Sequence, residues 1–78
     1  MKFYLDKIEQ VKTENEGEYN EYGSRTKYGD EQTARTKFYE TLMNVSNSEA
    51  HVYLDIKIVN SEGGIVKKDS IGAYIETE

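Results

Sequence analysis

The chain has 78 residues, no cysteine, no proline and one histidine, and 15 acidic side chains against 10 basic ones leave a net charge of −5. This length indicates a single domain spanning residues 1–78, and without cysteine the chain can form neither disulfides nor thiolate metal sites. The acidic balance disfavours direct binding to nucleic acid or to an anionic membrane, because both require a basic face. No apolar run approaches the length that a bilayer requires.

The N-terminal third of the chain is the least regular part of the pattern. Tyr4, Leu5, Ile8 and Val11 suit one face of an amphipathic helix, whereas Phe3 and Leu5 alternate as in a strand. Residues 18–28 contain three tyrosines and Thr26, residue types that favour extended structure, and the intervening 13–17 is polar and turn-like. We interpret residues 2–12 and 18–28 as two strands of a hairpin.

A helix is predicted over residues 30–46. Asp30 is a suitable N-cap, because its carboxylate can accept hydrogen bonds from the first free backbone amides. The apolar side chains that follow recur at spacings of four, four and three, which places them on one helical stripe: Ala34, Phe38, Leu42 and Val45.

The last third predicts a second hairpin. Residues 50–59 alternate with period two, so one face carries Val52, Leu54, Ile56 and Ile58 and the other carries His51, Tyr53, Asp55 and Lys57. Residues 60–64 form a turn with two glycines, and residues 65–75 alternate again. The expected fold is therefore α+β, a four-stranded antiparallel sheet in ββαββ order with one helix packed on one face.

Two short motifs carry a resemblance to a known group of proteins. Residues 33–42 include Ala34-Arg35-Thr36-Lys37-Phe38-Tyr39, and the chain nears its end with Ile71-Gly72-Ala73-Tyr74-Ile75-Glu76. In this arrangement the chain resembles small proteins encoded by phages and prophages of Gram-positive bacteria, in which an "A-x-x-K-[FY]-Y" helix precedes a hairpin ending in "G-x-Y-x-E". The resemblance implies a phage or mobile-element origin and brings no functional residues with it.

Catalytic machinery is not expected. His51 is the only imidazole, and Ser48 and Asp55 are its nearest candidate partners in the sequence. Asp55 lies four residues along the same strand, about 13 Å away by strand rise, so it cannot orient the ring. We therefore expect no enzyme, no cofactor and no metal site.

The densest functional signal is an acidic and tyrosine-rich stretch. Its candidate partner-binding residues are Glu14, Glu16, Glu18, Tyr19, Glu21, Tyr22 and Tyr28. The stretch lacks the alternating oxygens and the closing glutamate of a calcium loop, which favours a solvated acidic edge or a contact with a basic partner. The tyrosines suit an interface, but they equally suit the sheet face under the helix.

The expected function is that of a non-enzymatic phage or mobile-element accessory protein in the host cytoplasm. It would bind a host or competing-element protein that has a basic surface, and inhibition of a defence system is a candidate role. The alternative is a self-assembling or structural small phage protein, such as a homodimer, because a four-stranded sheet leaves strand edges uncovered.

Overall fold

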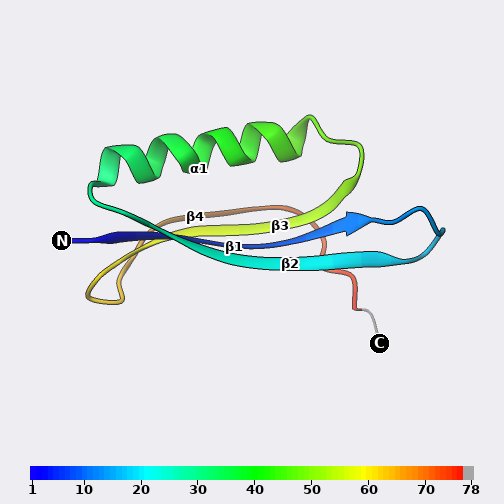
Figure 1. Cartoon of the computed structure of the whole chain (residues 1–78), viewed down its shortest axis with the longest axis horizontal. Coiled ribbons are helices and arrows are strands. Elements are labelled where there is room, and N and C mark those ends of the chain that lie inside the picture. Colours follow the sequence, from blue (N-terminus) through cyan, green and yellow to red (C-terminus); the bar gives the residue numbers. More distant parts are fainter. Residues whose placement is uncertain (77–78) are drawn as a thin grey trace.

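The computed structural model describes residues 1–76 and confirms the α+β fold in ββαββ order. Four antiparallel strands form one sheet in the order β2-β1-β3-β4, and a single helix lies across one of its faces (Figure 1). The elements are β1 (Phe3–Lys12), β2 (Tyr19–Tyr28), α1 (Glu31–Ser46), β3 (His51–Asn60) and β4 (Ile65–Gly72). The ambiguous N-terminal segment is therefore a strand, and it lies at the centre of the sheet.

Local sequence signals account for the start of α1 and for the turn between β3 and β4. Asp30 accepts a hydrogen bond from the Thr33 amide at 2.8 Å and another from the Thr33 hydroxyl at 2.9 Å, as expected of the N-cap. In the β3–β4 turn, the Asn60 side chain accepts from the amides of Glu62 and Gly64, and Gly63 adopts a φ of 86°. That positive φ is a conformation that glycine adopts without steric cost.

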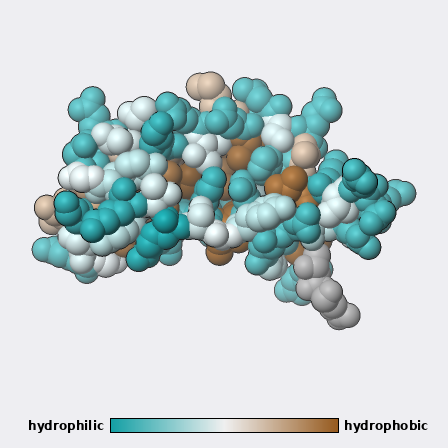
Figure 2. Space-filling model, in the orientation of Figure 1, coloured by the Kyte–Doolittle hydropathy of each residue, from teal (hydrophilic) through white to brown (hydrophobic). Residues whose placement is uncertain are grey.

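The core lies between α1 and the inner strands. Phe38 and Ala34 are fully buried against Leu54, Ile56 and Ile58 of β3, and the same cluster includes Leu5 of β1 and Val45. Figure 2 shows hydrophobic (brown) atoms between the helix and the sheet and hydrophilic (teal) atoms over most of the remaining surface. The other face of the sheet carries no helix, so it is open except where the C-terminal segment crosses it.

A β-bulge at the start of β3 changes which side chains face the helix, compared with the faces expected from the alternation. Gln10 pairs with Tyr53, but the next residue, Val11, pairs with His51, so Val52 is an extra residue in the ladder. The inserted residue brings His51 to the helix side of the sheet, where it contacts Glu9, and the expectation that it shares a face with Tyr53 is wrong. Val52 is only half-buried and does not belong to the core cluster.

The last strand is shorter than the alternation suggests. β4 ends at Gly72, which has a φ of 75°, rather than at Ile75. A Cβ atom at Gly72 would collide with the backbone carbonyl oxygen of Val52, so the chain turns closely over β3 at this point. Residues 73–76 then leave the β4 edge and cross the open face of the sheet.

Candidate functional site

The acidic residues occupy a hairpin end that projects beyond the rest of the fold. The Thr13 amide donates to the Glu18 carbonyl at 3.1 Å, and Gly17 has a φ of 84°, so residues 13–18 form the closed turn between β1 and β2. Figure 1 shows this end of the hairpin extending past the end of α1. We call residues 13–19 the acidic arm.

The carboxylates of the acidic arm are directed to solvent. Glu14, Glu16 and Glu18 are all exposed, and Asn15 donates to Glu18 at 3.0 Å. Within residues 1–76 none of these three glutamates forms an ion pair. The arm therefore presents a negative surface that no basic side chain of the described chain neutralises.

The structure divides the other sequence-predicted residues between separate places. Tyr19 is half-buried at the base of the arm, whereas Glu21 lies on the open face and Tyr22 on the helix side of β2. Tyr28 packs against the core at the opposite end of β2, about 30 Å from Tyr19 by strand rise. Tyr22 is 52% exposed and is thus available to a partner on a different face from Glu21.

A hollow of about 500 Å³ lies between the acidic arm and the C-terminal segment. Its lining is polar on the arm side and includes Glu18, Tyr19 and Asn20, while Ile75 and Glu76 approach from the other side. Tyr19 is therefore placed where a residue of a docked protein would meet both the arm and the C-terminal segment. The sequence could not indicate this hollow, because its two walls lie more than fifty residues apart in the chain.

The C-terminal segment is held on the open face by four contacts. The fully buried Gln10 donates from Nε2 to the Ile75 carbonyl at 2.6 Å and accepts from the Ile75 amide at 2.9 Å. Tyr74 packs edge-on against Tyr53 at 5.3 Å and donates its hydroxyl proton to Glu21 at 2.7 Å. The bond to Glu21 raises the pKa of Tyr74, because it favours the neutral phenol.

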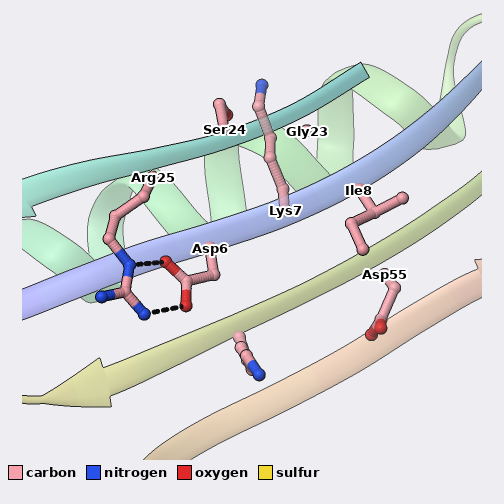
Figure 3. Close-up of a pocket in the computed structure, with 8 residues that line it drawn as sticks. Asp6, Lys7, Ile8, Gly23, Ser24, Arg25 and Asp55 are labelled. Carbon is pink, nitrogen blue, oxygen red and sulfur yellow. Dashed lines mark hydrogen bonds and ion pairs between the residues drawn. The ribbon is translucent and has the colours of Figure 1, made fainter. Parts of the chain in front are cut away.

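A second hollow, of about 300 Å³, lies in the middle of the open face (Figure 3). Ile8 forms part of its lining, and its cross-strand neighbour Gly23 contributes no side chain, which leaves Ile8 44% exposed. At one side Arg25 forms a bidentate pair with Asp6, with bonds of 2.6 and 2.7 Å, and Figure 3 shows the two side chains facing each other from neighbouring strands. Arg25 holds the pKa of Asp6 below its ordinary value, because the guanidinium stabilises the carboxylate.

On the helix side of the sheet, the His51 imidazole lies between the Ser48 hydroxyl and the Glu9 carboxylate. His51 Nδ1 lies 2.8 Å from Ser48 Oγ, and His51 Nε2 lies 3.0 Å from Glu9 Oε2. Sequence reasoning missed Glu9, because only the pairing of β1 with β3 and the bulge at Val52 bring it to the ring. No local signal could have found it.

The surroundings of this network do not suit acyl transfer. Ser48 follows the C-terminal end of α1, where the helix dipole is negative and opposes a developing oxyanion. The Ser48 amide already donates to Val45, and the Ala50 amide donates to the Ser48 hydroxyl. The network instead ties the α1–β3 loop to β1, which is a structural task.

Comparisons with known proteins identified no relative of this chain. No family model, no curated protein and no solved structure matches the chain. Within residues 1–76, no group of three or more His, Asp or Glu side chains is arranged to hold a metal ion. No helix in the same range combines the length and the apolar character needed to cross a bilayer.

Proposed function

We propose that this protein is a binding module whose acidic arm docks onto a basic surface of another protein. The observation that carries the proposal is the arm itself, which extends past the end of α1 (Figure 1) and whose three exposed glutamates form no ion pair within residues 1–76. Uncompensated surface charges of one sign steer a partner of opposite charge and increase the rate of encounter. The partner chemistry that fits is a basic protein surface rather than a nucleic acid or a membrane.

Tyr19 supplies the apolar anchor of this proposed interface. It is half-buried at the base of the arm and borders the hollow that the C-terminal segment closes on the other side. Tyrosine is enriched among residues that hold complexes together, because a large ring is buried while its hydroxyl keeps a polar partner. Charge therefore sets the association rate and Tyr19 sets the dissociation rate in this scheme.

The resemblance to phage and prophage proteins directs the choice of partner. A small acidic protein of that origin would bind a host or competing-element protein, and occupation of a basic nucleic-acid groove would make it an anti-defence inhibitor. The sequences compared with this chain offer no relative that bears on this origin. The origin and the inhibitory role therefore belong to the proposal.

The test compares two turn glutamates at opposite ends of the molecule. The protein is immobilised and exposed to a lysate of a Gram-positive bacterium at low and at high salt, and the captured proteins are identified. We expect capture at low salt to be lost with Glu16→Lys and retained with Glu62→Lys, which changes the net charge equally in the β3–β4 turn. For a purified captured protein, Glu16→Lys should slow association several-fold.

The second part of the experiment compares two tyrosine variants. Tyr19→Ala should mainly accelerate dissociation, because loss of an anchor acts on the lifetime of a complex. Tyr39→Ala is the matched control, since Tyr39 is 50% exposed on α1, away from the acidic arm. The proposal is wrong if the wild type captures nothing, or if Glu16→Lys and Tyr19→Ala capture the same proteins as their controls.

A further inference from the structure

The outer strand β2 is an edge that the fold leaves unprotected. Eight of its ten residues are exposed, because α1 lies mainly over β1 and β3. Its ladder with β1 runs from Phe3↔Tyr28 to Lys12↔Tyr19 without a register shift. A long, regular and exposed edge strand is a template for pairing with another strand.

The other edge, β4, carries the features that discourage such pairing. Its ladder with β3 is interrupted by a register shift between Ile58 and Val59. Lys67 and Lys68 are consecutive residues near the middle of this strand. Bulges and edge lysines are the usual protections of an edge strand. β2 has a single lysine, Lys27, and no bulge, so the two edges of this sheet differ in their readiness to pair.

The register of the sheet identifies the backbone groups that β2 presents at its open edge. In β1, the Lys12 amide bonds to Ala50 and the Lys2 carbonyl accepts from Ser61, so even-numbered residues of this strand direct their backbone groups toward β3. Odd-numbered residues of β1 therefore bond to β2, where their partners are even-numbered. The free amides and carbonyls of β2 belong to its odd-numbered residues: Tyr19, Glu21, Gly23, Arg25 and Lys27.

These five residues form a charge pattern that is complementary to itself. Glu21 and Arg25 lie symmetrically about Gly23, and all three face the same side of the sheet. If a second β2 strand pairs antiparallel about a two-fold axis at Gly23, each Glu21 lies directly opposite the partner's Arg25. Within residues 1–76, Arg25 already pairs with Asp6 and Glu21 accepts from Tyr74, so the two-fold contact adds a second neighbour of opposite charge to each side chain. Opposite charges in this cross-strand position stabilise pairing, and the absence of a side chain at Gly23 removes any obstacle at the axis.

We propose that two copies of this chain pair through their β2 edges, antiparallel and centred on Gly23, to form a continuous eight-stranded sheet. Five opposed pairs of odd-numbered residues exchange about ten backbone hydrogen bonds in this register. The two-fold axis is perpendicular to the sheet, so both α1 helices lie on one side and both open faces on the other. In this register Tyr19 lies opposite Lys27 of the second copy, whereas the glutamates at the tips of the two acidic arms remain outside the pairing. The dimer forms without any other protein, so its failure is distinguishable from failure of the proposed function.

The test uses charge reversal and complementation. The mass of the purified protein is measured by sedimentation over a range of concentrations, without any other protein present. Glu21→Arg places two arginines opposite each other, and Arg25→Glu places two glutamates opposite each other, so each variant alone should weaken the dimer by about tenfold or more. Because Glu21→Arg also loses the bond from Tyr74 and Arg25→Glu loses the pair with Asp6, circular dichroism and a thermal melt must first show that each variant is folded. An equimolar mixture of the two variants restores both opposed pairs and should recover a mixed dimer.

Two further variants separate this register from other modes of association. Gly23→Pro removes an outward amide that no residue of 1–76 accepts from, so it should abolish the dimer while circular dichroism shows a folded monomer. Lys68→Glu on the β4 edge is the control and should leave the mass unchanged. A wild type that stays monomeric at millimolar concentration overturns the inference, as does a dimer that the mixture fails to restore or that Lys68→Glu alters.

Discussion

Gln10 offers the sharpest test of how the open face is organised. Its side chain is fully buried, although it lies on the sheet face that α1 does not cover, and both ends of its amide bond to the backbone of Ile75. Gln10→Leu preserves most of the side-chain volume and removes both hydrogen bonds. We expect this change to release the C-terminal segment from the sheet without unfolding the core on the opposite face.

The expected magnitude follows from the two bonds that are lost. A neutral hydrogen bond contributes about 0.5–1.5 kcal/mol, so the pair holds the segment by roughly 1–3 kcal/mol. A loss of about 2 kcal/mol lowers the ratio of docked to released segment by about thirtyfold. The free energy of global unfolding should fall by no more than these roughly 1–3 kcal/mol, because the core on the opposite face stays packed when the segment is released.

Two measurements report on the segment separately from the core. Hydrogen exchange by NMR should show that the Ile75 amide loses protection in Gln10→Leu, while the core amides of β3 keep theirs. The pKa of Tyr74 should move back down toward its ordinary value of 10.0 when the bond to Glu21 is lost. Because that pKa is raised in the folded protein, the bond stabilises the segment below about pH 10 and its contribution disappears as the pH rises through the folded-state pKa.

The matched control is Gln32→Leu, which makes the same change at an exposed position of α1. It should leave both the Ile75 exchange rate and the Tyr74 titration as they are in the wild type. Unchanged protection at Ile75 in Gln10→Leu would refute the reasoning, because the segment would then be held by contacts other than this amide.

Two further predictions concern β2 and its pairing with β1. Tyr28→Ala should destabilise the fold by about 2 kcal/mol or more, since Tyr28 packs against the core. Tyr22→Ala should cost under about 1 kcal/mol, because Tyr22 is 52% exposed. Equal urea midpoints for the two variants would contradict the placement of these side chains. The pKa of Asp6 is lowered by Arg25 from 3.8, so the stabilisation from this pair is present above about pH 4 and is lost as the pH falls through the lowered value. Asp6→Asn should therefore reduce stability at pH 6 by up to about 1 kcal/mol, a small amount because the pair is partly exposed, and the gap to the wild type should close at the acid end. A gap that persists at pH 2 would show that the ion pair is not its cause.

Local chemistry was sufficient to predict the helix and the second hairpin. The spacing of Ala34 and Phe38 on one stripe, with Asp30 as the cap, depends only on neighbours in the sequence, and so does the turn at Gly63. The position of the acidic arm between two strands was predicted for the same reason. Turn-forming residues and clustered charge require solvent whatever the rest of the chain does.

Features that depend on pairing between distant segments escaped prediction. The periodicity of β3 is regular throughout, yet the bulge at Val52 reverses the face of His51, because it arises only when β3 meets β1. The same pairing brings Glu9 to the His51 ring. The break at Gly72 depends likewise on the close approach of the chain to the Val52 carbonyl oxygen, which no neighbour of Gly72 in the sequence reveals.

The amino-acid sequence by itself determined the helix, the C-terminal hairpin and where the chain is acidic, because propensity, period and charge are local properties. Its pattern in residues 2–12 suited a strand and a helix alike. Only the tertiary structure decided that β1 lies inside the sheet and β2 at its edge, since this order follows from which strands bury their faces under Phe38 and its neighbours. That order places Tyr28 under the helix, leaves Tyr22 exposed and opens the Glu21–Gly23–Arg25 edge. The positions of the candidate binding residues are thus set by a packing choice between segments that are remote in the chain.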